Sequence, residues 1–323
     1  MKVSILMAVY NAEKWVGKAI ESVINQSYDN WELICMNDGS TDNSLELLQD
    51  YADKDSRIRV YSYKHCGIHA VYLNKGILLA KGEFVFSLDS DDWISSDLLL
   101  QVLKRQNETN ADFVIPDMCR VDESGNELSW MKGCLGDRNA IITGRQAVVY
   151  SLDWSIYTFG LIKRSIALEQ LFDEDGYSVE VTSRRRLLAC EKVAFSEGTY
   201  YYLQNTQAIT KRFGVRKFYY VMIDVKMLQF LKENSFEIKV QEGYYADSLK
   251  RLIAAWILYA QRHKDLSKYD RQKVCSYLST AFSYMMQQTE LFKATRHTLS
   301  VKQRCVLTTK QQWLFNLYCY LRK

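Results

Sequence analysis

The sequence Phe84-Val85-Phe86-Ser87-Leu88-Asp89-Ser90-Asp91-Asp92-Trp93 joins an apolar run, typical of a buried strand, to three carboxylates within four residues. Neighbouring carboxylates repel one another, so the cluster is costly unless a cation or hydrogen-bond donors neutralise it. Mg²⁺ and Mn²⁺ suit this setting, because Mg²⁺ is typically held by one or two carboxylates together with substrate phosphates. The alternative is an acidic turn that caps a helix beginning near Ser95, and spacing alone does not separate the two.

Three further apolar runs precede this one along the chain. They predict strands at Val3–Val9, Trp31–Met36 and Arg57–Tyr61, and helical spacing of apolar residues predicts a helix after each strand. Asn11 is the expected N-cap of the first of these helices. Strands that alternate with helices predict βαβ units, so the expected fold class is α/β with a mainly parallel sheet.

In such a sheet, ligands bind outside the carboxyl ends of the strands, where Tyr10, Asp38 and Asp89 would all emerge. The turn Asp38-Gly39-Ser40-Thr41-Asp42 taken alone is typical of a helix cap, because Gly39 permits a tight bend and a hydroxyl can cap. Acidic residues at two strand ends of one sheet, taken together, could grip a nucleotide at its base and at its phosphates.

The charge of the chain is unevenly distributed. The net charge is +4 over 323 residues, but residues 1–210 hold 21 Lys and Arg against 30 Asp and Glu, whereas residues 211–323 hold 21 against 8. Amphipathic patterns rich in aromatic and basic residues predict helices at Tyr219–Leu231, Tyr244–His263, Val274–Met286 and Gln311–Leu321. We place a domain boundary near residue 212, between an acidic α/β region (1–212) and a basic helical region (213–323).

The cysteines and the hydropathy predict a cytoplasmic protein. Eight cysteines occur without a CxxC pair or a regular spacing, which favours reduced thiols over disulfides or a zinc site. The N-terminal apolar run is too short for a secretory signal, and no uninterrupted apolar run of about 18 residues predicts a transmembrane helix.

Several ordered segments of the first half resemble the family 2 glycosyltransferases. They are Val3–Asn11, Ile24–Tyr28, Asn37–Ser44, Asn74–Gly76, Ala80–Phe84 and Leu88–Trp93. The resemblance is close over residues 1–115 and looser to about residue 210. It implies a GT-A fold with a nucleotide-sugar half (1–115), an acceptor half (116–212) and a nucleotide-diphospho-sugar donor, often a UDP-sugar.

The resemblance also implies roles for individual residues. Tyr10 would stack on the base, and Asp38 would accept a hydrogen bond from it. Asp89 would reach the ribose or the diphosphate, and Asp91 with Asp89 would bind Mn²⁺ or Mg²⁺, which neutralises the departing nucleotide. The family often has an arginine before Asn74, and here Leu73 stands there, so Lys75 (or Lys64) is the expected cation near the diphosphate.

The catalytic base is the point at which the sequence departs most from the family. The family commonly carries a Glu-Asp pair whose Asp is the base, and here Glu180 is followed by Val181, which cannot accept a proton. Glu180 is therefore the predicted base, and the alternative is a solvated glutamate at a helix start. Asp173, Glu174 and Asp175 are reserve candidates; His65 and His69 are expected to be wall or surface residues.

These features predict an inverting glycosyltransferase that acts on a glycan or lipid-linked glycan in surface-polysaccharide assembly. An anionic membrane surface is a candidate partner of the basic region, whereas nucleic acid is not an expected partner; a helical subdomain with an aromatic core is the alternative for that region. The second hypothesis is a nucleotide-sugar-binding protein of the same fold without catalysis, as Val181 suggests. A third is a sugar nucleotidyltransferase, but Tyr10-Asn11-Ala12-Glu13 is not the Gly-rich loop that such an enzyme needs.

Overall fold

The computed structural model describes residues 1–205, 212–308 and 311. The chain divides into two compact units, Met1–Thr206 and Gln207–Lys323, so the division lies a few residues before the boundary expected near residue 212. The helix expected at Gln311–Leu321 falls, apart from Gln311, outside the described residues.

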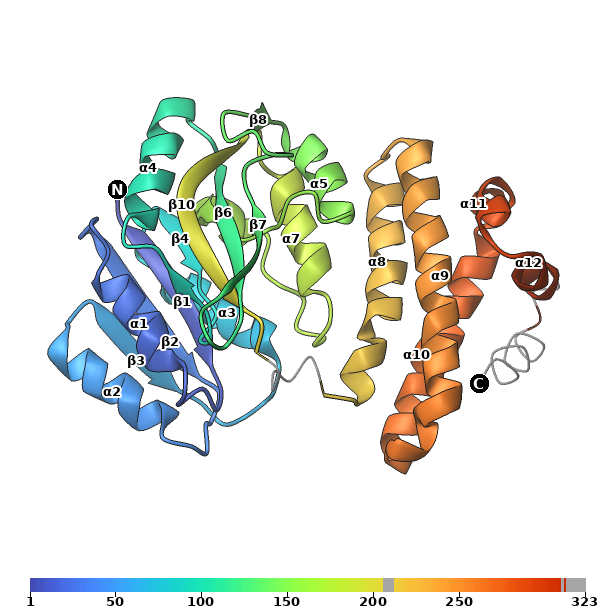
Figure 1. Ribbon diagram of the computed structural model, residues 1–323, viewed down its shortest axis with the longest axis horizontal. Coiled ribbons are helices and arrows are strands. Elements are labelled where there is room, and N and C mark those ends of the chain that lie inside the picture. Colours follow the sequence, from blue (N-terminus) through green and yellow to red (C-terminus); the bar gives the residue numbers. More distant parts are fainter. Residues whose placement is uncertain (206–211, 309–310, 312–323) are drawn as a thin grey trace. The chain divides into compact units, whose positions relative to one another are not determined.

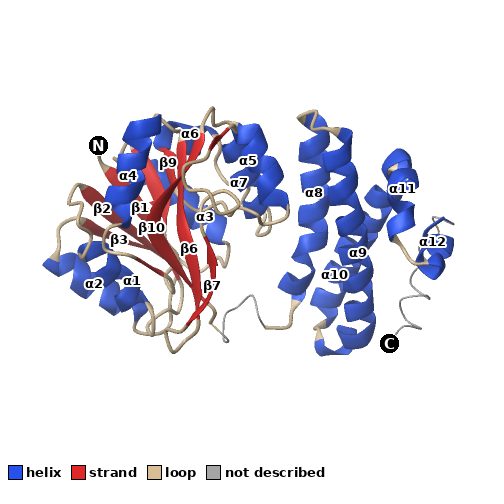
Figure 2. Ribbon diagram, turned by 45° about the horizontal axis from the view of Figure 1, so that its top comes forward, coloured by secondary structure: helices blue, strands red, loops and turns tan. Residues whose placement is uncertain are grey.

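A mixed sheet of ten strands forms the centre of the first unit (Figures 1 and 2). The strands are β1 (Val3–Val9), β2 (Trp31–Asn37), β3 (Ile58–Ser62), β4 (Phe84–Ser87), β5 (Trp93–Ile94), β6 (Phe113–Val121), β7 (Glu127–Met131), β8 (Ile141–Ile142), β9 (Leu161–Lys163) and β10 (Val193–Leu203). Their order is β3-β2-β1-β4-β9-β6-β10-β5, with β7 beside β6 and β8 beside β10. The longest pairings, β1 with β2 and β6 with β10, are parallel, which confirms the α/β class and the mainly parallel sheet.

Helices cover both faces of this sheet (Figure 2). They are α1 (Val16–Ile24), α2 (Ser44–Lys54), α3 (His69–Leu79), α4 (Leu98–Thr109), α5 (Gly144–Leu152), α6 (Arg164–Glu169) and α7 (Val179–Leu188). Alternate side chains of β1, such as Ile5 and Met7, pack with α1, α2 and α4, while Leu6 on the opposite face approaches α3. Because helices cover both faces of a central parallel strand, its side chains are buried on both sides, and the sequences of β1 and β2 are continuous apolar runs.

The strands expected in the first hundred residues are confirmed to within one residue at each end, whereas the expected N-cap of the first helix is wrong. Asn11 has a left-handed φ of 48°, and α1 begins only at Val16. The Asn11 side chain instead pairs with Thr41: its Oδ1 accepts from the Thr41 amide at 2.8 Å, and its Nδ2 donates to Thr41 Oγ1 at 3.2 Å. Asn11 therefore ties the turn after β1 to the turn after β2.

The second unit is helical. Its described α-helices are α8 (Tyr219–Glu233), α9 (Ile238–Arg262), α10 (Lys268–Gln287), α11 (Thr289–Thr295) and α12 (Val301–Thr308), and the first three confirm predicted helices. These helices enclose an apolar core of their own. Within it Asp224 is buried, and its two oxygens accept hydrogen bonds from Arg251 at 2.7 and 2.9 Å and from Tyr244 at 2.9 Å. A buried carboxylate needs such partners, because an unpaired charge is costly in the interior.

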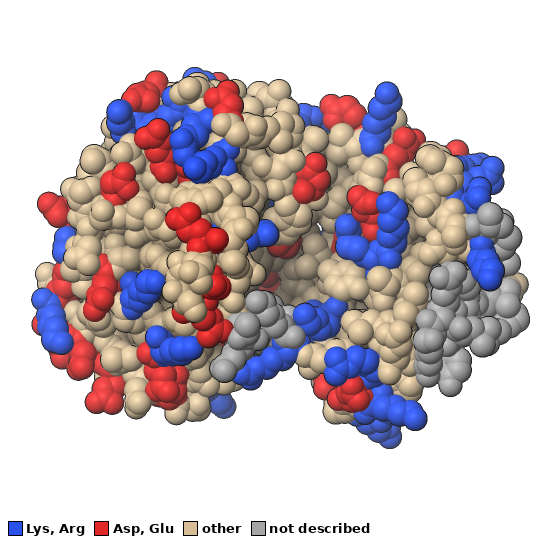
Figure 3. Space-filling view, viewed as in Figure 1, with Lys and Arg blue, Asp and Glu red and all other residues tan. Residues whose placement is uncertain are grey.

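Basic side chains are prominent on the surface of the helical unit. Figure 3 shows a group of Lys and Arg side chains at the end where α9 passes into α10, and Lys264 and Lys268 are exposed there. Among the helices that the structure describes, none is long and apolar enough to cross a membrane.

Candidate active site

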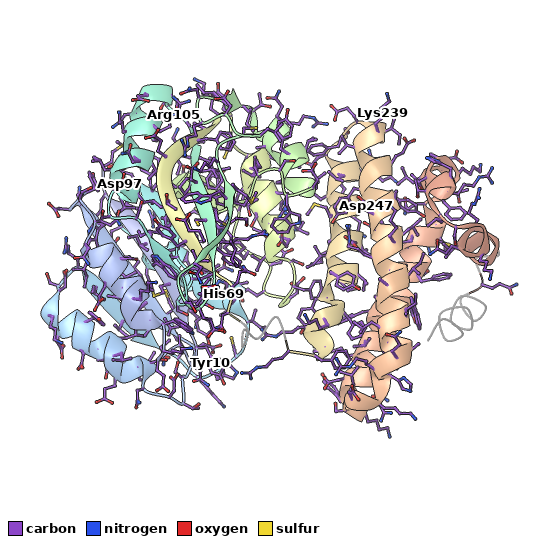
Figure 4. All side chains as sticks on the ribbon, in the orientation of Figure 1. Tyr10, His69, Asp97, Arg105, Lys239 and Asp247 are labelled. Carbon is purple, nitrogen blue, oxygen red and sulfur yellow. The ribbon has the colours of Figure 1, made fainter. Side chains whose placement is uncertain are left out.

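The carboxyl ends of β1, β2 and β4 bring three of the expected site residues to one edge of the sheet. Val9 pairs with Asn37, so Tyr10 and Asp38 follow directly on neighbouring strands, and the Asp38 amide donates to the Val9 carbonyl at 2.8 Å. Asp89 follows β4 on the other side of β1. Figure 4 shows Tyr10 and His69 at this end of the sheet, away from Asp97, which directly precedes α4, and from Arg105 on α4.

An aromatic pair lies at the end of β1. The rings of Tyr10 and His65 are stacked, with centroids 4.1 Å apart and planes 20° from parallel. His65 belongs to the loop between β3 and α3, and its Nδ1 lies 3.0 Å from the Asp38 carbonyl oxygen and 3.2 Å from Asp38 Oδ2. His65 is thus a wall residue of this site, with an aromatic face beside that of Tyr10.

The buried carboxylate of Asp38 holds this loop in place. Its Oδ1 accepts from the Cys66 amide at 2.7 Å and from the Tyr72 hydroxyl at 2.6 Å, and its Oδ2 accepts from the Gly67 amide at 3.0 Å. These three donors occupy both lone pairs of Oδ1 and one lone pair of Oδ2. A nucleobase that bound the Asp38 carboxylate would therefore have to use the side of Oδ2 that faces His65, or displace one of the three donors.

Gly39 allows the loop to come this close to Asp38. Its φ is 62°, and a Cβ at this position would lie 2.7 Å from the backbone nitrogen of His65. A side chain would push the 63–67 loop away, so the sequence needs glycine here for packing as well as for the bend.

Asp89 and Asp91 form an incompletely neutralised acidic pair after β4. Burial raises the pKa of the Asp91 carboxyl, and the charge of Asp89 raises it further, while Asn205 and His69 lower it. Nε2 of His69, at the start of α3, lies 3.7 Å from Asp89 Oδ1. The described part of the chain has no cluster of three or more His, Cys, Asp or Glu side chains that could hold a metal ion, so a cation here would need ligands from elsewhere as well.

Asp92, the third carboxylate of the cluster, is structural. It is almost fully buried, and its oxygens accept from the Tyr200 hydroxyl at 2.7 Å and from the Leu203 amide at 2.8 Å. Both donors lie on β10, more than a hundred residues further along the chain. Asp92 therefore fixes the acidic turn to β10. Of the three carboxylates in the turn, Asp89 and Asp91 are the two that remain available to a ligand.

Lys75 lies on α3 with its ammonium over the ring of Tyr63, 3.7 Å from the ring centroid, and 5.4 Å from the centroid of Tyr72. The neighbouring Asn74 is buried, and its side chain donates to the Phe172 carbonyl and to Glu174, both at 2.9 Å. Asn74 therefore joins α3 to the loop that precedes α7.

Glu180 lies in the first turn of α7, where it forms an ion pair with Arg184 one turn later. The Arg184 side chain is buried, and it also donates to Ser151 Oγ at 3.1 Å and to the Ser151 carbonyl at 2.7 Å. Val181, in the position of the family's usual base, is 1% exposed and belongs to the core. Glu180 is the one acidic residue of α7, and its side chain is partly exposed.

The reserve candidates before α7 all have partners. Arg185 holds both oxygens of Asp173 at 2.9 Å, Glu174 accepts from Asn74, and Asp175 accepts from the amides of Tyr177 and Ser178. Sequence reasoning missed Tyr200 and Arg184, which position Asp92 and Glu180. Tyr200 stands in no local motif, whereas Arg184 follows Glu180 by four residues, which is the spacing of an ion pair on one face of a helix, so the sequence held a signal for Arg184 only.

Comparisons with known proteins show which family this chain resembles. The family model described as Glycosyl transferase family 2 matches residues 4–172. Glycosyltransferase GlyG of Streptococcus pneumoniae serotype 4 is 32% identical over 220 residues, which cover 65% of this chain and 73% of that protein. Poly(ribitol-phosphate) beta-glucosyltransferase of Bacillus spizizenii is 33% identical over 135 residues, which cover 41% of this chain and 21% of that protein.

Among solved structures, S. aureus TarS 1-349 in complex with UDP-GlcNAc has the same GT-A fold, with a TM-score of 0.72 at 18% identity over 99% of this chain and 89% of that chain. The family model covers more than half of the chain, and the GlyG match covers more than two thirds of that relative. The chain therefore belongs to glycosyltransferase family 2.

Proposed function

We propose that this protein is an inverting glycosyltransferase that moves a sugar from a UDP-sugar to a glycan or a lipid-linked glycan in surface-polysaccharide assembly. The observation that carries the proposal is the pair Asp89 and Asp91 at the carboxyl end of β4, in the same edge of the sheet as the stacked rings of Tyr10 and His65. An acidic pair beside an aromatic platform suits the diphosphate and the base of a nucleotide. TarS, which shares the fold, binds UDP-GlcNAc, and this supports a UDP-sugar donor.

The residues present fit a divalent cation. Burial and the charge of Asp89 raise the pKa of Asp91, so among the residues that the structure describes the two carboxylates still disfavour each other's charge. Mn²⁺ or Mg²⁺ held by Asp91 and Asp89 needs no third protein ligand when donor phosphates and water complete its shell. When bound, the ion supplies positive charge that stabilises the departing UDP.

Tyr10 and Asp38 would act together on the base. Tyr10 offers an aromatic face for stacking, and Asp38 fixes the loop that carries His65 beside it. We propose that Asp38 contributes chiefly by positioning this loop. Lys75 would approach the diphosphate only by leaving the ring of Tyr63.

Glu180 would be the general base. In the transfer, its carboxylate takes the proton of an acceptor hydroxyl, and that oxygen forms a bond to the anomeric carbon of the donor sugar. The bond from this carbon to the UDP oxygen breaks on the opposite face, and its electron pair leaves with UDP. Arg184 keeps the carboxylate in place, because the buried guanidinium is itself anchored to Ser151.

A nucleotide-sugar-binding protein without catalysis is the second candidate. The buried Val181 at the usual base position favours it, since a core valine cannot exchange protons. This candidate predicts donor binding without donor consumption.

The acceptor is proposed to be a polyol-phosphate, glycan or lipid-linked glycan chain, by analogy with the poly(ribitol-phosphate) beta-glucosyltransferase of Bacillus spizizenii. The basic helical unit would hold the enzyme at the anionic cytoplasmic face of the membrane, where lipid-linked acceptors are assembled. The exposed Lys264 and Lys268 are among the side chains that could make this contact.

Calorimetric titration of UDP into the full chain tests the proposal. UDP should bind much more tightly with Mn²⁺ or Mg²⁺ than with EDTA, and Asp91→Ala should abolish the difference without unfolding the protein. Consumption of UDP-glucose or UDP-N-acetylglucosamine with Mn²⁺ then separates the enzyme from the binding protein. Equal affinity with and without metal, in both the wild type and the variant, would refute the donor site.

A further inference from the structure

Trp154 has an unusual backbone conformation in the turn that follows α5. Its φ is 64°, in the left-handed region that bulky side chains rarely adopt. Two hydrogen bonds hold the turn: the Ser155 amide donates to Asp153 Oδ1 at 3.0 Å, and the Ile156 amide donates to the Tyr150 carbonyl at 3.2 Å. Such strained residues persist only where surrounding structure holds them, and they gather at ligand sites.

The Trp154 ring is exposed to solvent. The residue is 52% exposed, so burial of the ring in the core does not offset the unfavourable backbone conformation. The guanidinium carbon of Arg184 lies 5.4 Å from the ring centroid. The buried Arg184 thus contacts Trp154 and also pairs with Glu180, so one residue positions both side chains.

The loop that leads into α7, and so to Glu180, adjoins α3. The loop before α7 is joined to α3 by Asn74, and a Cβ on Gly176 would lie 3.9 Å from a side-chain carbon of Ile68. Ile68 directly precedes His69, whose ring lies near Asp89. A sugar resting on Trp154 would therefore lie on the α7 side of the donor site, beside Glu180.

We propose that Trp154 is the platform for the acceptor, binding a pyranose ring of a glycan through its exposed face. The C–H groups on one face of a pyranose are apolar, and they pack on the electron-rich face of an indole, while the sugar hydroxyls stay free to meet Glu180. The left-handed backbone fixes the ring in place before the sugar arrives, which lowers the entropy lost on binding. This inference rests on the proposed transfer to a glycan.

The test compares the wild type with Trp154→Ala, Trp154→Phe and Trp154→Gly, and with Trp130→Ala as a matched control. Trp130 is also an exposed tryptophan of the same unit, but it lies on β7 and donates to Glu127 at 2.9 Å. Methyl β-D-glucopyranoside, methyl β-D-galactopyranoside and methyl N-acetyl-β-D-glucosaminide are the probes. Their binding is read by saturation-transfer NMR, and transfer to them from UDP-glucose or UDP-N-acetylglucosamine is read by UDP release.

Trp154→Ala should raise the KM for the methyl glycoside about tenfold and weaken its NMR signal, because the stacking surface is lost. The Kd for UDP with Mn²⁺ should stay within about twofold. Trp154→Phe should retain most of the affinity, and Trp130→Ala should match the wild type. Trp154→Gly should lose glycoside binding like Trp154→Ala, yet melt about 2–4 °C higher than it, because only glycine relieves the left-handed φ.

Unchanged glycoside KM and NMR signal in Trp154→Ala would overturn the platform, as would a wild type that binds none of the three glycosides. A wild type that binds a glycoside through Trp154 but neither binds UDP nor consumes a donor would instead overturn the proposed function while leaving the platform standing. The NMR measurement of glycoside binding needs no turnover, so failure of the Trp154 platform can be distinguished from failure of the proposed function.

Discussion

The hydroxyl of Tyr200 donates a 2.7 Å hydrogen bond to Asp92 Oδ2, and both side chains are almost fully buried. The same hydroxyl oxygen accepts from the amide of Asp89 at 3.2 Å. Burial, followed by the charges of Asp89 and Asp91, raises the pKa of Asp92 well above its ordinary value. Tyr200 thus connects β10 to the turn that carries the acidic pair, and it stabilises a carboxyl that the interior disfavours.

Tyr200→Phe should destabilise the protein and also weaken metal-dependent UDP binding. The variant leaves a buried carboxyl with one donor fewer, which typically costs about 1–3 kcal/mol, and it frees the Asp89 amide from its acceptor. Urea unfolding and UDP titration with Mn²⁺ measure the two effects. Tyr157→Phe is the matched control, because Tyr157 is another buried tyrosine that donates to a carbonyl, that of Pro116. Equal loss of UDP affinity in both variants would mean that Tyr200 acts only through stability.

Asp91→Asn should make the metal-free protein more stable at neutral pH. The pKa of Asp91 is raised above its ordinary value of 3.8 by burial and by Asp89, so the folded protein binds more protons than the unfolded chain just above that pH. Its stability therefore falls as pH rises through this window, and the neutral Asn removes the loss. Thermal melts in EDTA between about pH 4 and pH 7 measure the effect.

Asp112→Asn provides a control in which the expected change in melting temperature has the opposite sign. Burial would raise the pKa of Asp112, but Lys163 and the amides of Lys192 and Glu191 hold it below its ordinary value. Its contribution to stability is therefore present above the ordinary pKa and is lost on acidification, so Asp112→Asn should lower the melting temperature at neutral pH. A lower melting temperature for Asp91→Asn in EDTA would contradict the description of the acidic pair as incompletely neutralised.

Glu180→Gln should lower the transfer rate by about 10²–10⁴-fold while UDP binding with Mn²⁺ is retained, because a positioned base contributes on that scale. Asp112→Asn is the matched control: it also removes a carboxylate that forms an ion pair in the same unit, that with Lys163, but it is not a candidate base. The kcat of each variant, with UDP affinity measured in parallel, tests whether Glu180 is the general base. An active wild type whose rate is unchanged in Glu180→Gln would place the base elsewhere.

Val181→Asp should fail to restore a family-like base. The side chain at this position is 1% exposed, and burial of a polar group without a partner costs roughly 2–7 kcal/mol. The variant should therefore unfold at lower urea without gaining activity. A stable Val181→Asp protein with a raised kcat would show that α7 can turn this position toward the acceptor.

The full chain should sediment with phosphatidylglycerol vesicles at low salt and be released as ionic strength rises, because its basic unit is attracted to anionic lipid. Lys264→Glu and Lys268→Glu should each weaken binding at least about fivefold, since a Lys near the surface is worth about 1 kcal/mol. Lys104→Glu on α4 is the control, because Lys104 is also exposed but belongs to the acidic unit. Equal binding to phosphatidylcholine vesicles would contradict an electrostatic attachment.

The sequence alone determined the framework of the sheet edge formed by β1, β2 and β4. Continuous apolar runs predicted β1 and β2, and the polar turn after each strand predicted that Tyr10, Asp38 and Asp89 reach one edge. These predictions succeeded because strand burial and βα connections are encoded by neighbouring residues.

Only the tertiary structure decided how each of these side chains is used. Asp38 has its oxygens occupied by the 65–67 loop and by Tyr72, and Asp92 is fixed by Tyr200 on β10. Likewise, the ring of Trp154 lies beside the guanidinium of Arg184, thirty residues further along the chain. Partners so distant in sequence leave no periodic or local signal, because the fold alone brings a hydrogen-bond donor to its acceptor or an aromatic ring to its cation.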